Sequence, residues 1–233
     1  RAGAVSGVQT VTVTVKPVND APVIAATSSL TVNEDTAGVV TVAITDPDAG
    51  DAHTVVITAQ PPNGKLSISG NKVTYTPNKD WNGTDSFKLQ VKDQAGAVSG
   101  IQTVTVTVKP VNDAPAIPVA TTLTIDEDTT GTHTVVITDP DLGMPSDSHT
   151  LEGTQQPSNG TVTSAKSGNN FVLTYKPKKD WNGTDTVKVR VKDAAGAVSG
   201  VQTLTITVKP VNDAPTIPAT AAYAIDEDKV GTH

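Results

Sequence analysis

The sequence predicts an all-β fold, with Greek-key β-sandwich domains arranged in tandem along the chain. Three observations lead to this prediction. A seven-residue string, Lys-Pro-Val-Asn-Asp-Ala-Pro, occurs three times; aliphatic residues alternate with threonine over short stretches; and no window has the period of a helix. A sequence that repeats itself at a fixed period predicts an array of similar units rather than one large domain.

The repeated string sets the register of the array. It occupies residues 16–22, 109–115 and 209–215, so the first period is 93 residues and the second is 100 residues. The additional residues fall between Asp139 and His149 and between Gly160 and Pro177. Insertions are tolerated in loops rather than in paired strands, so we expect loops at both places.

The same register predicts the domain organisation. Two repeats are complete, at 23–110 and 116–210, and residues 111–115 link them. Residues 1–22 are expected to be the last strand of a truncated preceding repeat with its linker. Residues 211–233 are expected to be a linker with the first strand of a truncated following repeat. About 90 residues per repeat is within the usual size of a domain.

Each strand of the sandwich is predicted from aliphatic residues that alternate with polar ones and from turn residues at its ends. Val-Thr-Val-Thr-Val at 11–15 and 104–108, and Leu-Thr-Ile-Thr-Val at 204–208, indicate half-buried antiparallel strands. Glycine, proline and asparagine separate the other stretches. About seven short strands with regular turns are typical of an immunoglobulin- or cadherin-like sandwich. The remaining strands of the first complete repeat are expected at 29–33, 39–45, 53–59, 65–69, 72–76 and 85–91, with counterparts in the second.

Composition excludes several classes of partner. The net charge of −7, from 24 acidic and 17 basic residues, argues against nucleic acid and against an anionic membrane surface. No apolar run is long enough for direct membrane insertion. Cysteine is absent and aromatic residues make up 3% of the chain, so each core is small and has no disulfide. A small domain of this kind needs another form of stabilisation, and a metal ion is the candidate.

Acidic residues recur at fixed offsets in both complete repeats, mostly in predicted loops. Asp and Asn are also common in turns, so any one of them alone is equally consistent with a turn. Oxygen ligands without His or Cys favour calcium, which binds six to eight oxygens. The recurring sets are Glu34-Asp35, Asp46-Pro47-Asp48, Asp51, Asp80, Asp85 and Asp93, then Glu127-Asp128, Asp139-Pro140-Asp141, Asp147, Asp180, Asp185 and Asp193.

These residues resemble a known family. Asn-Asp-Ala-Pro resembles the linker between cadherin domains, Asp-Pro-Asp resembles the cadherin Asp-x-Asp loop, and residues 34–38 are similar to the cadherin Glu-Asn-x-x-x-Gly segment. The stretch from Tyr75 to Asp93, kept from Tyr175 to Asp193, is similar to the cadherin-like tandem repeats of large bacterial surface adhesins, including biofilm-associated and RTX adhesins. The cadherin Leu-Asp-Arg-Glu motif is absent, and either Asp80 or Asp85 would have to replace its carboxylates.

The resemblance implies that calcium binds at each linker. At the complete junction, the ligands would be Glu34 and Asp80 or Asp85 from the repeat before it, Asn112 and Asp113 from the linker, and Asp139, Asp141, Asp193 and Asp147 from the repeat after it. Half of such a site would be formed by Asn19, Asp20, Asp46, Asp48 and Asp93. The opposite half would be formed by Glu127, Asp180 or Asp185, and Asp213.

The function that the resemblance implies is that of a calcium-rigidified extender segment of a bacterial surface adhesin. It would be extracellular, contact neighbouring repeats of its own chain, and support adhesion or biofilm formation. One alternative is a module that binds host or matrix glycans or proteins through the insertions at 142–146 and 164–170. Another is adhesion between copies of the chain, in which segments 1–16 and 216–226 add to an open sheet edge.

An enzyme is not expected, because the sequence contains no pattern of a nucleophile and a base. The histidines have no metal-binding spacing, and His53, His133 and His149 are expected to be surface residues at strand ends. Trp81 and Trp181 are expected to plug one end of each sandwich, with stacking on a ligand as the alternative. Asn82-Gly83-Thr84 and its counterpart at 182–184 match an N-glycosylation pattern, but Asn-Gly favours a tight turn.

Overall fold

The computed structural model describes residues 2–25, 29–118, 121–142, 148–217 and 227. The chain divides into two compact units, Arg1–Val111 and Asn112–His233. The regular structure of the described residues consists of β-strands alone, as the sequence predicts. No described helix is long and apolar enough to cross a bilayer.

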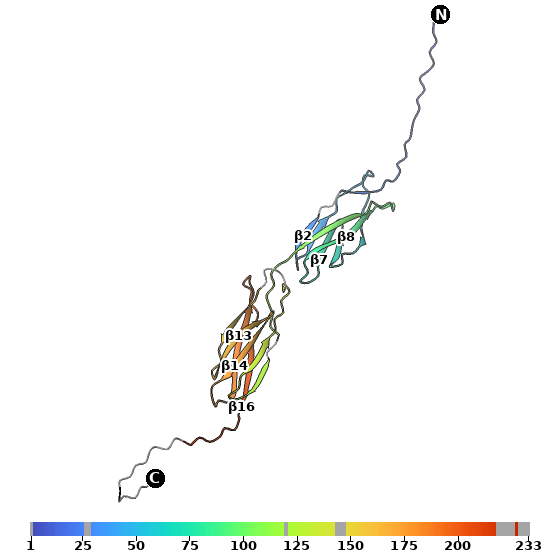
Figure 1. The fold of residues 1–233 in the computed structure, drawn as a ribbon. Helices are drawn as coiled ribbons and strands as arrows, with labels where there is room; N and C mark the ends of the chain where they lie inside the picture. Colours follow the sequence, from blue (N-terminus) through green and yellow to red (C-terminus); the bar gives the residue numbers. More distant parts are fainter. Residues whose placement is uncertain (1, 26–28, 119–120, 143–147, 218–226, 228–233) are drawn as a thin grey trace. The chain divides into compact units, whose positions relative to one another are not determined.

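The first unit is a sandwich of two sheets with a short accessory pair (Figure 1). One sheet has the strand order β2-β9-β8-β5, the other has the order β3-β7-β6, and β1 pairs with β4. Alternate residues of each strand face the core because side chains alternate between the two faces of a sheet. The strands are β1 (Val23–Ile24), β2 (Leu30–Asn33), β3 (Gly38–Thr41), β4 (Ile44–Thr45), β5 (Thr54–Ala59), β6 (Gly64–Ser69), β7 (Lys72–Pro77), β8 (Gly83–Lys92) and β9 (Gln102–Lys109).

The second unit repeats this plan, with the orders β10-β16-β15-β12 and β11-β14-β13. A single bridge between Ala116 and Thr138 takes the place of the accessory pair. The insertion after Gly160 lengthens the hairpin, whose strands have eight residues each instead of six. The strands are β10 (Thr122–Asp126), β11 (Gly131–Val135), β12 (Thr150–Gln155), β13 (Gly160–Ser167), β14 (Asn170–Pro177), β15 (Gly183–Lys192) and β16 (Gln202–Lys209).

Two features of the sheets differ from the prediction. The strands at 104–108 and 204–208 pair antiparallel on one side only, because β9 and β16 also pair in parallel with β2 and β10. The strand expected at 39–45 is divided into β3 and β4, which pair in different sheets. Between them lies Val42, which is fully buried and donates its main-chain N–H to the carbonyl of Asn71 (2.8 Å).

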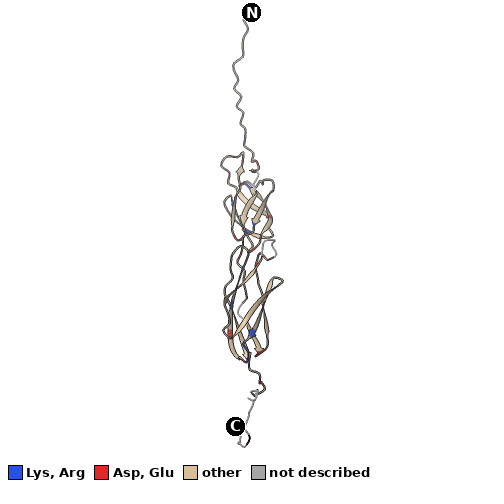
Figure 2. Ribbon diagram, turned by 60° about the vertical axis from the view of Figure 1, so that its left-hand side comes forward, with Lys and Arg blue, Asp and Glu red and all other residues tan. Residues whose placement is uncertain are grey.

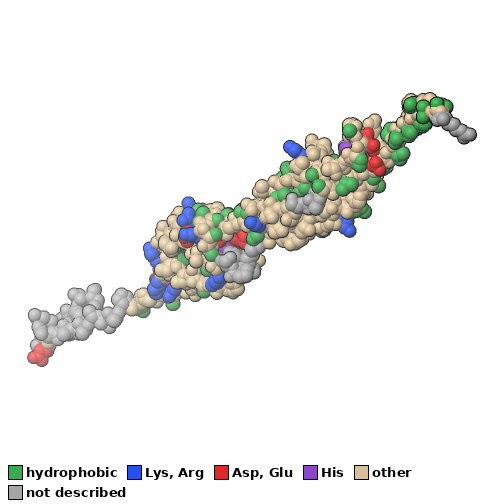
Figure 3. All heavy atoms as spheres, turned by 90° about the horizontal axis from the view of Figure 1, so that it is seen from above, with side chains coloured by type: hydrophobic (Ala, Val, Ile, Leu, Met, Phe, Trp, Pro, Cys, Tyr) green, Lys and Arg blue, Asp and Glu red, His purple; other side chains and the backbone are tan. Residues whose placement is uncertain are grey.

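The N-terminal segment does not form the strand expected at 11–15. Residues 2–22 belong to no strand, and Val11, Val13 and Val15 are at least 77% exposed. Figure 3 shows hydrophobic side chains, in green, on the surface of the N-terminal segment. A strand exists only through hydrogen bonds to a neighbour, and no described strand pairs with this segment. The strand expected at 216–226 lies outside the described residues, apart from 216 and 217, and so does the insertion at 142–146, apart from Leu142.

Each unit has its own core between its two sheets. Tyr75 and Phe87 are buried among valines and a leucine in the first unit, and Tyr175 is buried likewise in the second. Val187 replaces Phe87 in the second core, where the aromatic Phe171 enters from β14 instead. A different strand thus supplies the large side chain.

Tryptophan packs against the core in both units, as expected for a plug. Trp81 and Trp181 are partly buried against their respective clusters. The glycines that follow, Gly83 and Gly183, have φ angles of 137° and 138°. These values favour glycine. The turn itself lies just before Asn-Gly, where the N–H of Trp81 donates to the carbonyl of Asn78 (3.2 Å), and Gly83 begins β8.

Candidate metal centres at the two ends of each unit

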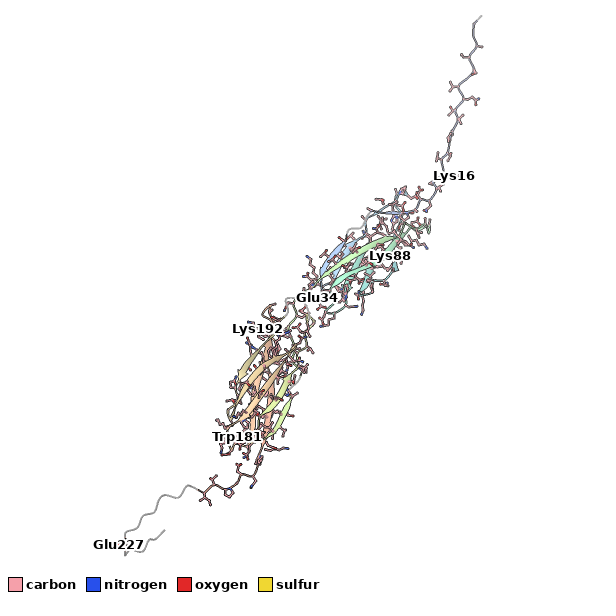
Figure 4. The ribbon with its side chains drawn as sticks, in the orientation of Figure 1. Lys16, Glu34, Lys88, Trp181, Lys192 and Glu227 are labelled. Atoms are coloured by element: carbon pink, nitrogen blue, oxygen red, sulfur yellow. The ribbon has the colours of Figure 1, made fainter. Side chains whose placement is uncertain are left out.

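Acidic side chains gather near both ends of each unit, where the ribbon in Figure 2 is coloured red. We call the end beside the preceding Asn-Asp linker the leading end, and the end from which the following linker departs the trailing end. Figure 4 labels Lys192 near the leading end of the second unit and Trp181 near its trailing end.

At the leading end of the first unit, the linker is hydrogen-bonded to the loop after β4. The main-chain nitrogen of Asp20 donates to Oδ2 of Asp48 (2.7 Å), and the nitrogen of Asp48 donates to Oδ1 of Asp46 (2.9 Å). Nδ2 of Asn19 donates to Oδ2 of Asp93 (2.9 Å), which follows β8. Carboxylate oxygens lie within 4.8 Å of one another in Asp46, Asp51 and Asp93.

The leading end of the second unit repeats these contacts. The main-chain nitrogen of Asp113 donates to Oδ2 of Asp141 (2.7 Å), and the nitrogen of Asp141 donates to Oδ1 of Asp139 (3.0 Å). Nδ2 of Asn112 donates to Oδ2 of Asp193 (2.8 Å). Two linker residues are therefore fixed to two buried or half-buried carboxylates in both units.

Donors at this end keep the carboxylates ionised. The side chain of Asn19, together with main-chain nitrogens of the loop after β8, holds the pKa of Asp93 below its ordinary value despite burial. Burial opposes ionisation of Asp193, but hydrogen bonds from Asn112 and from the loop after β15 outweigh it and lower the pKa.

The histidines were predicted to be surface residues at strand ends. His53 and His149 do directly precede β5 and β12, but the structure corrects the surface part, because both side chains are largely buried against an aspartate. Nε2 of His53 lies 2.8 Å from Oδ2 of Asp46, and Nε2 of His149 lies 2.7 Å from Oδ2 of Asp139. The side chain of His149 is 3% exposed. His133 is partly buried in the middle of β11. Sequence position did not reveal these contacts because they depend on how the loop folds back: each aspartate begins the loop that its histidine ends, seven residues before His53 and ten before His149. The hydrogen bond from His53 lowers the pKa of Asp46.

At the trailing end of the second unit, a buried glutamate is hydrogen-bonded to the linker that follows. Glu127 follows β10 and is 6% exposed. Its Oε1 accepts a hydrogen bond from the main-chain nitrogen of Val211 (2.6 Å), and its Oε2 accepts one from Nδ2 of Asn182 (3.3 Å). Beside it, carboxylate oxygens lie within 4.8 Å of one another in Asp128, Asp180 and Asp213.

The trailing end of the first unit has the same construction. Buried Glu34 accepts hydrogen bonds from the main-chain nitrogen of Val111 and from Nδ2 of Asn82 (3.5 Å). The main-chain nitrogen of Asp80 donates to Oδ1 of Asp35 (3.0 Å). Glu34 therefore holds the start of the linker while Asp35 and Asp80 form a pair.

This pair of aspartates has an unusual backbone in both units. Asp35 and Asp80 have φ angles of 55° and 54°, and Asp128 and Asp180 have 60° and 54°. These are the described non-glycine residues with positive φ. The left-handed region is disfavoured for residues with a Cβ atom, and such strain clusters at functional sites.

Asp85 and Asp185, the alternatives to Asp80 and Asp180, point into the sandwich. Asp85 is 3% exposed, and its oxygens accept hydrogen bonds from the hydroxyl of Tyr75 (3.0 Å) and the main-chain nitrogens of Asn63 (3.0 Å) and Ser86 (2.8 Å). Asp185 is 5% exposed and accepts four such bonds. Burial opposes its ionisation, but these donors lower its pKa.

The structure therefore sorts the residues singled out from the sequence. It places Asn19, Asp20, Asp46, Asp48 and Asp93 at one leading end and Asn112, Asp113, Asp139, Asp141 and Asp193 at the other. Asp147 lies outside the described residues. Asp35 and Asp128 recur in the sequence but were not assigned as ligands. The sequence signal that could have identified them is that each directly follows a glutamate at the same position of the repeat.

The residues present fit a hard divalent cation. The leading end of the first unit and the trailing end of the second each bring three carboxylates close together without thiol ligands, and such carboxylates repel one another unless a cation joins them. The lowered pKa values of Asp46, Asp93 and Asp193 favour the ionised form that a cation requires.

The chain belongs to the bacterial cadherin-like domain family, which matches residues 19–110 and 112–210. Domains of this class are extracellular adhesion modules without enzymatic activity, and they typically bind calcium. The two matched segments make this chain a tandem array of such domains.

Individual proteins resemble parts of this chain. Integrin beta-like protein C of Dictyostelium discoideum is 35% identical over 72 residues, which is 28% of this chain and 4% of that protein. The chain thus spans a small fraction of the curated relatives that it matches. The structure of protocadherin gamma B2 extracellular cadherin domains 3–6 is 16% identical with a TM-score of 0.53, covering 82% of this chain and 48% of that one, and shows the shared fold. An endo-fucoidan hydrolase of glycoside hydrolase family 107 has 19% identity and a TM-score of 0.36, covering 82% and 29%, too little for any argument about activity.

Proposed function

We propose that this chain is an extender segment of a bacterial surface adhesin, in which calcium ions fix successive cadherin-like units to one another. The segment spaces an adhesive region from the cell and thereby supports cell adhesion or biofilm formation. The bacterial family and the tandem repetition support this proposal. An array of non-enzymatic units connected by short linkers is suited to setting a distance.

The observation that carries the proposal is that the second unit holds linker residues at both of its ends. Its leading end binds Asn112 and Asp113 through Asp193 and Asp141, and its trailing end places Asp213 beside Asp128 and Asp180. Asp113 and Asp213 are the same position of the repeated string. One linker aspartate can thus take part in both kinds of contact.

The repeat register then assigns the residues of the complete junction. Asp80 is preferred to Asp85 as a ligand because the oxygens of Asp85 already accept three hydrogen bonds inside the unit. The proposed ligand set is Glu34, Asp35 and Asp80 from the first unit, Asn112 and Asp113 from the linker, and Asp139, Asp141, Asp147 and Asp193 from the second unit.

The residues of the chain prepare this junction in three ways. Glu34 accepts a hydrogen bond from the main chain of Val111, which orients the linker as it leaves the first unit. Asn112 and Asp113 attach it to the second unit. Pro115 restricts its own φ and the residue before it. Bound calcium would supply the positive charge that lets the carboxylates of both units approach one linker.

Calcium titration of the two-unit chain tests the proposal. A cation that binds only the ordered junction stabilises it by about 2.7 kcal/mol when its free concentration is 100 times the dissociation constant. We expect chelation with EDTA to lower the melting temperature and to broaden the distance distribution from small-angle X-ray scattering. Asp113→Ala should reduce both effects.

Glu152→Ala is the matched control, because Glu152 lies within β12, pairs with Arg190, and is not part of either end. It removes one carboxylate and should leave the response to calcium unchanged. A melting curve and a scattering profile that are the same with calcium and with EDTA would contradict the proposal.

A further inference from the structure

Asp85 and Tyr75 form a buried polar pair that the calcium ligands do not include. Tyr75 is fully buried, and its hydroxyl donates to Oδ2 of Asp85 (3.0 Å). The same oxygen accepts the main-chain N–H of Asn63 (3.0 Å), and Oδ1 accepts that of Ser86 (2.8 Å). All three donors are neutral groups. A buried carboxylate without a cationic partner is costly, so its presence calls for a reason.

The pair recurs in the second unit with one more hydrogen bond. Asp185 accepts from the hydroxyl of Tyr175 (3.1 Å) and from the main-chain nitrogens of Ser158 (3.0 Å), Asn159 (2.8 Å) and Thr186 (2.9 Å). The recurrence is notable because the neighbouring hairpin differs in length between the two units.

A short chain of hydrogen bonds leads from this pair to the trailing end. The carbonyl of Asn63 accepts the main-chain N–H of Asn78 (2.9 Å), and the carbonyl of Asn78 accepts that of Trp81 (3.2 Å). The loop fixed in this way carries Asp80, whose nitrogen bonds to Asp35, and Asn82, whose amide bonds to Glu34.

The second unit has the same path. The carbonyl of Asn159 accepts the N–H of Lys178 (2.9 Å), and the carbonyl of Lys178 accepts that of Trp181 (3.2 Å). The loop again ends in an aspartate with left-handed φ, Asp180, and an asparagine bonded to a buried glutamate, Asn182.

Close packing makes the turn rigid at its other side. A Cβ atom on Gly64 would lie 2.4 Å from Cε2 of Tyr75, and one on Gly160 would lie 2.5 Å from Cε2 of Tyr175. Because glycine has no Cβ atom, the turn at Asn63 and Gly64 packs directly on the ring of Tyr75. The hydroxyl of Tyr75 therefore lies within hydrogen-bond distance of both Asp85 and the carbonyl of Asn63.

We propose that Asp85 and Tyr75 are positioning residues that hold the loop bearing Asp80 and Asn82 in the geometry that binds calcium, and that Asp185 and Tyr175 do the same at the trailing end of the second unit. This proposal rests on the proposed function above. It assigns Asp85 an indirect role, through the turn at Asn63, in place of direct contact with the ion.

Tyr75→Phe is the discriminating variant, because a buried phenol cannot be a calcium ligand and the substitution removes only its hydroxyl. Isothermal titration of calcium into the calcium-free two-unit chain should show the tightest binding event weakened about 10-fold at unchanged stoichiometry, as for the loss of other outer hydrogen bonds around metal sites. Amide NMR signals of Asn78, Asp80 and Asn82 should shift in the calcium-free variant, whereas those of Asp46 and Asp48 should not.

Tyr175→Phe is the matched control. It removes the equivalent hydroxyl near the trailing end of the second unit, and that end is not part of the complete junction. It should lower the calcium-free melting temperature about as much as Tyr75→Phe, yet leave the tightest calcium affinity unchanged. A role limited to stability would leave the affinity unchanged in both variants and overturn the proposal.

Two further outcomes separate this proposal from the function on which it rests. A wild-type chain that binds no calcium would overturn the proposed function and this inference with it. A wild-type chain that binds calcium while Tyr75→Phe binds it equally tightly would overturn the positioning role alone. Loss of one bound ion in Asp85→Asn would make Asp85 a ligand, which also contradicts the inference.

Discussion

Nδ2 of Asn112 donates a hydrogen bond of 2.8 Å to Oδ2 of Asp193, which lies 81 residues further along the chain. The bond attaches a linker side chain to a carboxylate that is 5% exposed. The same bond forms between Asn19 and Asp93 in the first unit. The linker is therefore part of the leading end of the unit that follows it.

Asn112→Ala should raise the pKa of Asp193 toward its ordinary value in calcium-free buffer, because the substitution removes a donor that stabilises the ionised carboxylate. The pKa is measured by following the side-chain carboxyl carbon by NMR during a pH titration. Asn212→Ala is the control, since Asn212 bonds to the carbonyl of Asp213 and leaves Asp193 untouched. An unchanged pKa in Asn112→Ala would contradict this account.

The stability of the second unit should fall in acid in a definite range. The pKa values of Asp185 and Asp193 are below the ordinary value of 3.8 in the folded chain. Their ionised forms therefore contribute stability that is fully present above that value and is lost as the pH falls through the folded pKa. Urea unfolding without calcium should give a level free energy above about pH 4 and a decline below it. Asp185→Asn should make the decline shallower, and an equally steep decline would argue against the role of Asp185.

Asp80→Gly and Asp80→Ala should differ in stability although both remove the same carboxylate. Asp80 has φ 54°, and a left-handed backbone costs about 1–2 kcal/mol for a residue with a Cβ atom but little for glycine. In calcium-free buffer the glycine variant should be the more stable of the two by about that amount. Both should lose the same part of the calcium response. Equal free energies of unfolding would show that the backbone at Asp80 is not strained.

Gly64→Ala should destabilise the first unit by about 1–3 kcal/mol, the usual cost of overpacking. The new methyl group would lie 2.4 Å from Cε2 and 2.8 Å from the hydroxyl oxygen of Tyr75 and displace that side chain from Asp85. Chemical denaturation measures the loss. Gly100→Ala is the control because no atom lies within 4 Å of its Cβ position and its φ is not in the left-handed region. Equal effects of the two substitutions would refute the close packing.

Phe171→Ala should cost the second unit about 3–5 kcal/mol, as expected when a buried phenylalanine is truncated and a cavity remains. Phe171 is the phenylalanine of this core, in which Val187 replaces the aromatic residue of the first unit. Val201→Ala, at a position 50% exposed, should change the free energy of unfolding by less than about 0.5 kcal/mol. A small effect of Phe171→Ala would mean that neighbouring side chains relax into the cavity, which contradicts the prediction.

Local sequence pattern predicted most strands of the two units to within two residues, because alternation and turn residues act within a few positions. It did not predict the parallel pairing of β2 with β9, which depends on which distant strand becomes the neighbour. It also failed at residues 11–15, whose sequence from Gln9 to Lys16 is identical to that of β9 from Gln102 to Lys109. Identical residues form a strand only where a partner strand is present.

The acidic set was predictable from its recurrence, but its division into roles was not. Asp80 and Asp85 lie five residues apart, and burial distinguishes them: the carboxylate of Asp85 accepts the hydroxyl of Tyr75 inside the sandwich, whereas the carboxylate of Asp80 pairs with Lys79 near the surface. The aspartate partners of His53 and His149 lie at the opposite end of the same loop, seven and ten residues earlier. Such relationships depend on the folded conformation of the loops and on the packing of the sheets, and local sequence does not show them.

The parallel ladder between the first and last strands has a consequence for a chain under tension. In the first unit, Leu30 to Asn33 pair in parallel with Val106 to Lys109, and in the second, Thr122 to Asp126 pair with Thr205 to Lys209. A pull on the preceding and following linkers acts on these two strands in opposite directions along their length. The hydrogen bonds of the ladder are then loaded in shear, all together, rather than opened one after another, so each unit should resist stretching more than its modest core suggests.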